Sequence, residues 1–429
     1  MNEQIEQRIT QLNNGEIPSG YEKTEFGVFP CDWVKDKTFG DLFDFYGGLG
    51  KSRDELGDEG HAYLHYGDLH RGAFNVVSHE QYEQLPKYDV ALKGTETYLM
   101  EDGDVAFLDA SEDLEGTSCA VLIDNPDNEP FIAGLHIIYG KSKDESLEKW
   151  YKQYITSSES VRKQFQRLAA GFKVYGVNRD TLPRIQVAYP KSTEEQSKIA
   201  EILMKWDEAI KFQESYNDYL ETRKTYLMRK LLSPSEEWKR AKLGDIAEMY
   251  AGGTPSTKIP EYWGGDIPWI HSGLIQNNYI DINCIDGRIT EQGLKNSSTD
   301  WIRKNSVLVA ITGATCANIA YLKCDATANQ SVISITTSYV NPLYLYFYLQ
   351  NARNQLLSLQ NGSAQGGLTL KYLESFEIMF PGKDEQNRTV DVLLSVDDEI
   401  ALNKDKIEKL KKQRKALQQY LLNGIVRVK

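Results

Sequence analysis

Two segments of the chain carry apolar side chains at alternating steps of four and three residues. In the first segment these positions are Ile199, Leu203, Trp206, Ile210, Leu220, Leu227 and Leu231. In the second they are Leu393, Val396, Ile400, Ile407, Leu410, Leu417 and Leu421. Such spacing places apolar side chains on one face of a helix and is typical of a coiled coil. We therefore predict two long helices whose seam is formed by these residues.

The two predicted helices share further features. Aligning them places polar Gln213 opposite Asn403 and Lys224 opposite Arg414. A polar residue in a coiled-coil seam fixes the register of the helices at some cost in stability. Each segment is also preceded by a proline and begins with acidic residues, which favours a helix start. The helices are therefore predicted to be copies of one element.

The rest of the chain repeats in the same way. The stretch "KTFGDL" (residues 37–42) matches "KLGDI" (242–246), and "YLHYG" (63–67) matches "WIHSG" (269–273). Further on, "GDVAFLD" (103–109) aligns with "NSVLVAI" (305–311), and "AAGFKVYGV" (169–177) with "QNGSAQGGL" (360–368). Loops change length more readily than elements, so the spacing of the matches drifts. We predict two related globular domains, each followed by one long helix.

Composition supports this organisation. The chain has 429 residues, of which 41% are hydrophobic and 26% charged, as expected for a protein with two or more cores. It has no apolar signal core and no apolar run near the roughly 20 residues that cross a bilayer, so we expect a cytoplasmic protein without membrane association. Its five cysteines lack a Cys-x-x-Cys pair, which favours free thiols over disulfides or a metal site.

Charge is divided unevenly along the chain. Residues 1–150 hold 31 acidic and 12 basic side chains, a net charge of −19, whereas residues 151–429 hold 31 acidic and 37 basic ones, a net charge of +6. Local field, more than total charge, steers a polyanion. The second portion is therefore suited to bind DNA unaided, while the first needs neighbouring basic surface or a partner.

The stretch "FYGGLGKS" (residues 45–52) resembles a phosphate-binding loop, but Phe45 stands where such a loop needs glycine. The strand "VAFLD" (105–109) would supply an acidic partner, which keeps nucleotide binding as an alternative. In the second copy, however, Pro255 and Ser256 stand opposite Lys51 and Ser52. Both copies keep only a glycine-rich polar loop followed by a cation. Such a loop offers amide and hydroxyl donors to a surface, and an ordinary turn is the alternative.

Several stretches together resemble the specificity subunits of type I restriction-modification systems. They are "GYEKTEFGVFPCDW" (20–33), "LMRKLLS" (227–233), "KLGDI" (242–246), "GGTPSTKIPEYWGGDIPWI" (252–270) and "LQQYLLNGIVRV" (417–428), and the resemblance covers essentially the whole chain. It implies an α+β fold in which two repeated mixed α/β target-recognition domains are joined by two long antiparallel coiled-coil helices in a pseudo-two-fold arrangement. It also implies that each domain reads one half of a split DNA site.

The resemblance also suggests boundaries and partners. The expected domains are an N-terminal helical segment (1–20), target-recognition domain 1 (21–190), a central spacer helix (191–233), target-recognition domain 2 (234–382) and a C-terminal spacer helix (383–429). Expected partners are double-stranded DNA with a bipartite target, two modification (methyltransferase) subunits and restriction subunits. No cofactor is expected on this chain, whereas S-adenosylmethionine and ATP with magnesium are expected on the partners.

Candidate DNA contacts are the polar residues of the repeated loops and of the segments aligned with each other. In the first domain they are Lys51, Ser52, Arg53, His65, Arg71, Lys173 and Tyr175. In the second they are Thr254, Ser256, Thr257, Lys258, His271, Ser272, Ser363, Gln365 and Lys371. Arginine and lysine neutralise phosphates or read guanine, while hydroxyl and amide groups bond base edges. For His65 and His271, a hydrogen-bonded core histidine is an equal alternative.

A catalytic function is less well supported by the sequence. "NPLY" (341–344) is similar to an amino-methyltransferase tetrapeptide, but Leu343 replaces its second proline, and an asparagine cap with proline at the first helical position explains it better. No metalloprotease, nucleophile-elbow or nuclease motif is evident. We expect a chain that is not itself an enzyme. A coiled-coil scaffold that binds only proteins remains the alternative from another functional class.

Overall fold

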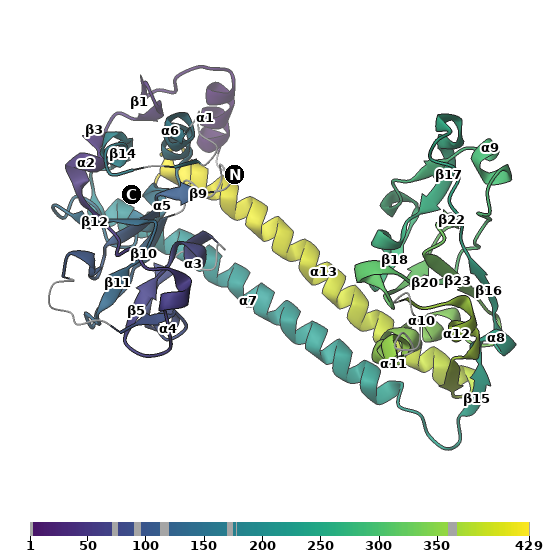
Figure 1. The fold of residues 1–429 in the computed structure, drawn as a ribbon. Coiled ribbons are helices and arrows are strands. Elements are labelled where there is room, and N and C mark those ends of the chain that lie inside the picture. Colours follow the sequence, from purple (N-terminus) through teal and green to yellow (C-terminus); the bar gives the residue numbers. More distant parts are fainter. Residues whose placement is uncertain are drawn as a thin grey trace. The chain divides into compact units, whose positions relative to one another are not determined.

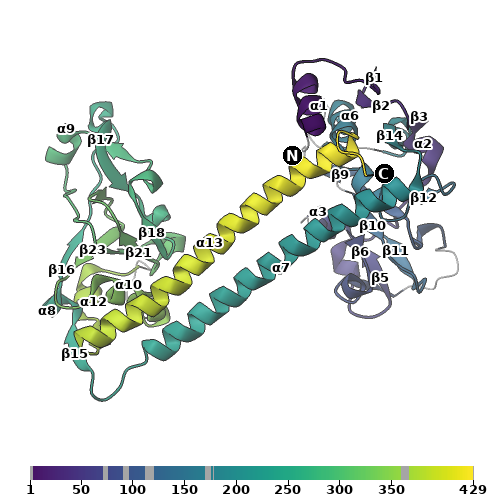
Figure 2. The same cartoon turned by 180° about the vertical axis from the view of Figure 1, so that it is seen from behind.

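The computed structural model describes residues 3–70, 76–89, 96–111, 120–169, 175–176, 178–358 and 367–428. It divides into two compact units, each considered by itself. The first unit comprises residues 1–212 and 407–429, and the second comprises residues 213–406. Both ends of the chain thus belong to the first unit, as the purple and yellow ends of the ribbon show (Figure 2).

The first unit is built on a five-stranded and a three-stranded sheet. The larger sheet has the order β4 (Phe43–Gly47), β12 (Ile137–Ser142), β8 (Val105–Leu108), β10 (Ala120–Ile123) and β6 (Val76–Val77). The smaller sheet has the order β11 (Phe131–Ala133), β5 (His61–Leu64) and β7 (Lys87–Tyr88). Neighbouring strands are antiparallel except for β10 with β6 and β11 with β5.

The second unit repeats both sheets strand for strand. Its larger sheet has the order β16 (Glu248–Ala251), β23 (Val332–Thr336), β20 (Val307–Ala310), β21 (Ile319–Leu322) and β18 (Asn278–Ile280). Its smaller sheet consists of β19 (Arg288–Ile289), β17 (Trp263–Ile270) and β22 (Thr327–Ala328). The two parallel pairs, β18 with β21 and β17 with β22, occupy the same places as in the first unit. The predicted repeat is therefore confirmed as a repeat of fold.

Each larger sheet separates two apolar layers. In β8, Val105 and Phe107 pack with one buried cluster and Ala106 and Leu108 with another. Strand β20 alternates in the same way between its two clusters. Successive side chains of a strand point to opposite faces, so a fully apolar tetrapeptide indicates a strand that is buried on both sides.

Two-stranded antiparallel ladders bring the beginning and end of each domain together. They are β3 (Trp33–Thr38) with β14 (Gln186–Pro190) in the first unit, and β15 (Lys239–Lys242) with β24 (Glu377–Phe380) in the second. The first unit also contains β1 (Tyr21–Thr24) paired with β2 (Gly27–Pro30), and β9 (Ala110–Ser111) paired with β13 (Tyr175–Gly176). Because β14 and β24 lead directly into the long helices, these ladders fix where each helix leaves its domain.

Shorter helices cover the sheets. Those of the first unit are α1 (Glu3–Asn13), α2 (Phe39–Leu42), α3 (Tyr66–His70), α4 (His79–Tyr82), α5 (Lys152–Ile155) and α6 (Glu159–Ala169). Those of the second are α8 (Leu243–Ile246), α9 (Glu291–Lys295), α10 (Pro342–Asn351), α11 (Arg353–Ser358) and α12 (Leu370–Ser375). The side chain of Asn341 accepts hydrogen bonds from the backbone N–H groups of Leu343 and Tyr344. The "NPLY" tetrapeptide is thus the helix cap that the sequence predicted.

The two predicted long helices are α7 (Thr193–Leu231) and α13 (Lys383–Leu422), of 39 and 40 residues (Figure 1). At 1.5 Å per residue each is about 60 Å long. In the second unit their paired residues run in opposite order along the chain: Asn403 donates to Gln213 O, and Asp397 lies 2.6 Å from Lys224. Within this unit the helices are therefore antiparallel.

The apolar seam serves two purposes. In the second unit Leu220 packs with Val396 and Ile400 between the helices, as predicted. Towards the helix ends, the predicted seam residues do not pack only between the two helices. There Ile199, Leu203, Leu417 and Leu421 join the core of the first domain, while Leu227, Leu231 and Leu393 join that of the second. The same periodicity thus attaches the helices to the sheets. Among the described residues, no helix is long and apolar enough to span a membrane.

Candidate nucleic-acid interface

The glycine-rich loop of each unit is held by the same backbone bonds. In the first, the N–H groups of Gly48 and Leu49 donate to Ile137 O (2.9 Å) and Ala133 O (2.8 Å). In the second, those of Gly252 and Gly253 donate to Val332 O (3.0 Å) and Ala328 O (2.8 Å). These acceptors lie at equivalent places in the two sheets. Both loops therefore lie at the same edge of the larger sheet. At this edge β4 and β8, or β16 and β20, end, and β12, or β23, begins.

An aromatic side chain of the smaller sheet fixes each loop. The Tyr63 hydroxyl donates to Leu49 O at 2.5 Å, and the Trp269 indole N–H donates to Gly253 O at 3.0 Å. Tyr63 and Trp269 are the residues that the sequence alignment places opposite each other, and so are Leu49 and Gly253. Different side chains thus make one contact at one position, which preserves the shape of the loop in both copies.

Close backbone contact explains why both loops begin with paired glycines. A β-carbon on Gly48 would lie 1.8 Å from Gly134 O, and one on Gly252 would lie 2.3 Å from Ala328 O. Any side chain at these positions would push the loop away from the neighbouring turn. The glycines are therefore required by the packing of loop against sheet.

In the first unit the predicted cations are paired with acidic groups. Lys51 Nζ lies 2.9 Å from Glu55 Oε1, and the Arg53 guanidinium lies 3.0 Å from Asp68 Oδ1. Hydrogen bonds to Tyr88 and Glu55 raise the pKa of Lys51, and hydrogen bonds from Lys51 and Ser52 lower that of Glu55 to about 2. These charges are compensated within the unit, which leaves less positive field for a polyanion.

The same geometry does not support a phosphate-binding loop. Residues Arg53–Glu55 form a short 3₁₀ turn in place of the helix whose N-terminus would face a phosphate. The predicted acidic strand, β8, is antiparallel to both of its neighbours, and its Asp109 lies 2.9 Å from His136 Nδ1. The structure thus does not bring together the lysine, the helix N-terminus and the acidic strand that a nucleotide site needs.

In the second unit the tip of the loop is exposed. Ser256, Thr257 and Lys258 are exposed, and the indole N–H of Trp263 donates to Ser256 O at 3.2 Å. Trp263 in turn meets Trp269 edge to face, with ring centroids 5.0 Å apart. The two indoles support the loop from the sheet side, so that hydroxyl and ammonium groups project from a fixed base.

The recurring histidines share one local contact but differ in exposure. The Nδ1 atoms of His65 and His271 accept hydrogen bonds from the N–H groups of Gly67 (3.2 Å) and Gly273 (3.1 Å). His65 is 5% exposed, and burial lowers its pKa, which agrees with the structural alternative. The His271 side chain is 44% exposed, and its Nε2 lies 3.9 Å from Oδ1 of the exposed Asp286. The two histidines thus form the same kind of turn in their units, and His271 is the more exposed of the two.

Only some of the remaining predicted residues lie in the described part of the chain. Ser272 begins the turn after His271, and Lys371 is exposed on α12. The segment leading to α12 is joined to the loop edge, because Leu368 N–H donates to Ile311 O (3.0 Å) directly after β20. Arg71, Lys173, Ser363 and Gln365 lie outside the described residues. Of Tyr175, the structure describes the backbone, which pairs with Ser111.

Sequence reasoning missed several polar residues at this edge. Thr254 donates its hydroxyl hydrogen bond to the side-chain oxygen of Gln330, which is itself exposed. In the first unit the rings of Tyr66 and His136 meet edge to face at 5.3 Å. His136 immediately precedes β12, and Gln330 stands two residues before β23. Aligning the turns before those strands would have identified them.

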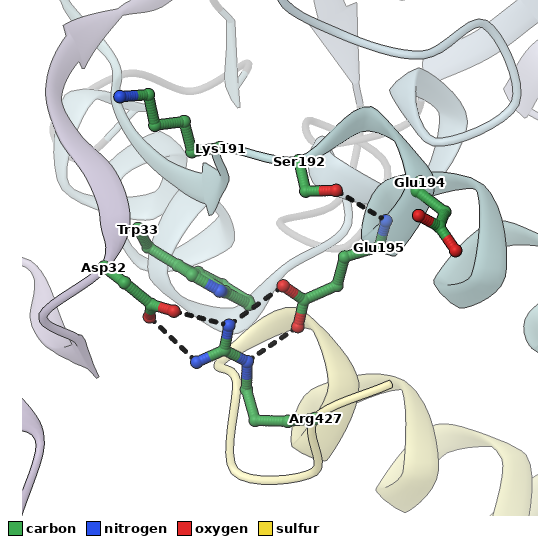
Figure 3. A pocket seen from close by; sticks show the side chains of 7 residues that line it. All are labelled: Asp32, Trp33, Lys191, Ser192, Glu194, Glu195 and Arg427. Atoms are coloured by element: carbon green, nitrogen blue, oxygen red, sulfur yellow. Dashed lines mark hydrogen bonds and ion pairs between the residues drawn. The ribbon is translucent and has the colours of Figure 1, made fainter. Parts of the chain in front are cut away.

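A cleft in the first unit is lined by Arg427 and by the two carboxylates that it bonds (Figure 3). Arg427 donates to both carboxylate oxygens of Glu195 (2.6 and 2.9 Å) and to both of Asp32 (2.8 and 3.0 Å), and its guanidinium lies 5.8 Å from the Trp33 ring. This bidentate clamp joins the C-terminal segment to the first turn of α7 and to the strand entry at β3. It is a structural junction.

Comparison with known proteins finds sequence similarity over part of the chain. A family model described as type I restriction modification DNA specificity domain matches residues 235–412. Over 181 residues the chain is 34% identical to the type I restriction enzyme MjaIX specificity subunit of Methanocaldococcus jannaschii. The chain is therefore similar to type I restriction-modification specificity subunits over part of its length. A second relative, the EcoR124I/EcoR124II specificity subunit of Escherichia coli, is 32% identical over 179 residues.

The sequence matches cover a smaller part of the chain than the similarity of fold does. The two sequence matches cover 41% and 39% of this chain, and they span 42% and 43% of the specificity subunits concerned, less than half of each. The solved structure of the type I restriction-modification S subunit from M. genitalium is 15% identical. It covers 91% of this chain and 96% of its own, with a TM-score of 0.55. The similarity of fold to this S subunit thus extends over nearly the whole chain.

The specificity-family match and the repeat together define the candidate interface. The second-unit candidates from Thr254 to Lys371 lie inside the matched residues 235–412. The first-unit candidates lie outside them and depend on the internal repeat, whose loop contacts are those described above. We therefore regard the loop edge of each larger sheet as the candidate interface of this chain.

Proposed function

We propose that this chain is the DNA-recognition subunit of a type I restriction-modification complex and that each globular unit reads one half of a bipartite site. The observation that carries the proposal is the duplicated loop, held in both units by an equivalent aromatic-to-carbonyl hydrogen bond. Two copies of one rigid, polar, glycine-based loop suit a ligand with two similar parts. Duplex DNA offers such parts, since its phosphates and base edges repeat along the helix.

The two units contribute to binding by different means. In the second, Lys258 and the neighbouring hydroxyl groups are exposed and suit phosphate contact and base reading. In the first, Lys51 and Arg53 are already paired with carboxylates, so its share of the affinity comes from hydrogen bonds more than from charge. The chain therefore binds DNA best as a whole, within an assembly that adds basic surface.

The long helices have two roles in this proposal. They set the separation of the half-sites, and they dock two modification subunits, which carry S-adenosylmethionine. Restriction subunits, with ATP and magnesium, join the same complex. The support for docking is that both α7 and α13 present exposed apolar side chains along their length, among them Phe212, Tyr219, Tyr226 and Leu402. Such exposure in a long helix favours a partner.

Methylation mapping tests the proposal. The chain is expressed with its modification partner in cells that lack other methyltransferases, and methylated bases are sequenced genome-wide. We expect one bipartite motif with a fixed spacer. A protein-only scaffold would give no sequence-specific methylation that depends on this chain.

Exchange of a domain provides a sharper test. Residues 21–190 are replaced by the equivalent residues of another specificity subunit, and the motif is mapped again. We expect one half of the motif to change and the other to remain. A change in both halves would contradict independent reading by the two units.

A further inference from the structure

Two carboxylates hold equivalent positions in the helix pair. In the first unit, Asp207 on α7 accepts two hydrogen bonds from the Arg414 guanidinium on α13 (2.8 and 2.9 Å). In the second, Asp397 on α13 lies 2.6 Å from the Lys224 ammonium on α7. The alignment that places Lys224 opposite Arg414 also places Asp207 opposite Asp397. The two ion pairs are therefore copies of one another, with the helices exchanged.

Each carboxylate also contacts the globular domain of its own unit. The hydroxyl of Tyr154, on α5, donates to Asp207 Oδ2 at 3.0 Å. The hydroxyl of Tyr279, on β18, donates to Asp397 Oδ2 at 2.6 Å. Each carboxylate thus joins three elements: the two helices and the domain that carries the recognition loop. The tyrosines come from different elements, so this contact is not a simple consequence of the repeat.

Further contacts reinforce both junctions. In the first unit, Gln418 donates to Ser157 Oγ (2.6 Å) in the turn after α5, and it also bonds Arg414. In the second, the Lys224 ammonium lies 5.8 Å from the ring centre of Phe347 on α10. The cation of each junction therefore also touches the domain, directly or through one residue.

Burial distinguishes these junctions from other pairs between the helices. The side chains of Lys224 and Asp397 are 16% and 11% exposed, and those of Arg414 and Asp207 are 18% and 27% exposed. The pairs Arg223–Glu399 and Glu221–Lys404 are 40% or more exposed on both sides. Exposed pairs contribute little and hold geometry loosely, whereas a partly buried carboxylate with several hydrogen bonds admits fewer arrangements.

We propose that Asp207 with Tyr154, and Asp397 with Tyr279, are positioning residues that fix the orientation of each recognition domain on its helices and thereby the spacing of the DNA half-sites. The inference rests on the proposed function. In the described part of the chain the tyrosines touch no recognition loop, and loss of the hydroxyl leaves the ion pair between the helices in place. Loss of the hydroxyl should therefore loosen spacing without altering the bases that are read.

The test measures spacing separately from activity. Tyr154→Phe and Tyr279→Phe are each expressed with the modification partner, and methylation is mapped at both half-sites with the wild-type spacer and with spacers one base pair shorter and longer. We expect methylation at the altered spacers, relative to the wild-type spacer, to rise at least about tenfold. The half-site sequences should stay unchanged.

Tyr216→Phe is the matched control. Tyr216 also donates its hydroxyl to a carboxylate, Glu399 at 2.5 Å, but both residues lie on the long helices and neither belongs to a domain. It should keep the wild-type spacer preference. If Tyr154→Phe and Tyr279→Phe keep that preference as well, the positioning role is wrong.

A second measurement, of DNA binding, applies to any variant complex whose methylation is too weak to map. The purified complex of each variant is titrated with duplexes of the three spacers. Preserved preference for the wild-type spacer, with equal weakening on all three, would overturn the inference, whereas a reduced preference would support it. Failure of the proposed function is a separate outcome, because the wild-type chain would then give no bipartite motif.

Discussion

Lys51 and Glu55 are bonded to each other one turn apart, with 2.9 Å between ammonium and carboxylate. At the exposed tip of the corresponding loop in the second unit stands Lys258, which makes no ion pair within the described part of the chain. The same loop therefore presents a compensated charge in one unit and a free one in the other. Phosphate contact should be divided unequally between them.

Replacing Lys258 by alanine should weaken binding to all DNA sequences alike. Because a lysine that neutralises one phosphate releases about one counterion, the slope of log K against log salt should fall by about one unit. Lys51→Ala is the matched variant and should change the slope much less, since its ammonium is already paired. Fluorescence anisotropy across a salt series measures both. An unchanged slope for Lys258→Ala would remove it from the contacts.

Replacing Thr257 by valine tests base reading. The substitution keeps the shape and removes one hydroxyl, so binding to the proper half-site should lose about 1–3 kcal/mol if that hydroxyl bonds a base edge. Binding to unrelated sequences should change far less. Competition titration with matched and scrambled half-sites gives the difference. Equal losses on both would contradict direct readout by Thr257.

The Tyr63 hydroxyl organises its loop and should matter for stability. It donates to Leu49 O and accepts from the N–H groups of Leu135 (2.8 Å) and Lys51 (3.1 Å). Tyr63→Phe leaves these buried groups unbonded and should cost about 2–3 kcal/mol, or roughly 4–12 °C in the melting of the first unit. Calorimetry measures the shift. Tyr82→Phe, whose hydroxyl makes one contact of 3.5 Å, is the control and should melt near the wild type.

Asp104 should make stability depend on pH. It is 4% exposed, and burial raises its pKa from 3.8 to about 7. Because this lies above the unfolded value of about 3.9, the folded state binds more protons between pH 4 and 7, and stability falls as pH rises through that window. Asp104→Asn should remove this decline and stabilise the protein by about 2–4 kcal/mol at pH 8. Urea unfolding at several pH values measures it, and parallel curves for both proteins would contradict the assignment.

Local and periodic features of the fold were readable from the sequence. The apolar steps predicted both long helices and Asn341 predicted a helix cap, because each depends on neighbours within one or two turns, and the internal repeat predicted two related domains. Contacts between distant residues were not readable. The bonds from Thr254 to Gln330 and from Tyr154 to Asp207 depend on how sheets and helices pack, and the seam pattern alone did not tell which leucines face a helix and which face a domain.

The Lys51–Glu55 pair is a different case. Its spacing is visible in the sequence, yet the charge of Lys51 suggested a free phosphate contact. Only the local backbone, in which Ser52 caps the turn and Glu55 folds back onto it, decides that the lysine is paired. Charge signs along a sequence thus do not reveal which charges are available to a ligand.

The composition of the first unit determines the order in which the protein can fold during its synthesis. Its core contains Leu421 and Leu422, and Arg427 clamps its entry strand, so these residues complete a domain whose sheets were synthesised long before them. Residues 213–406 need no later segment for their unit and can fold while that completion is awaited. Synthesis that stops just before Leu421 would therefore leave a chain that holds every residue of its second unit and lacks residues that complete its first.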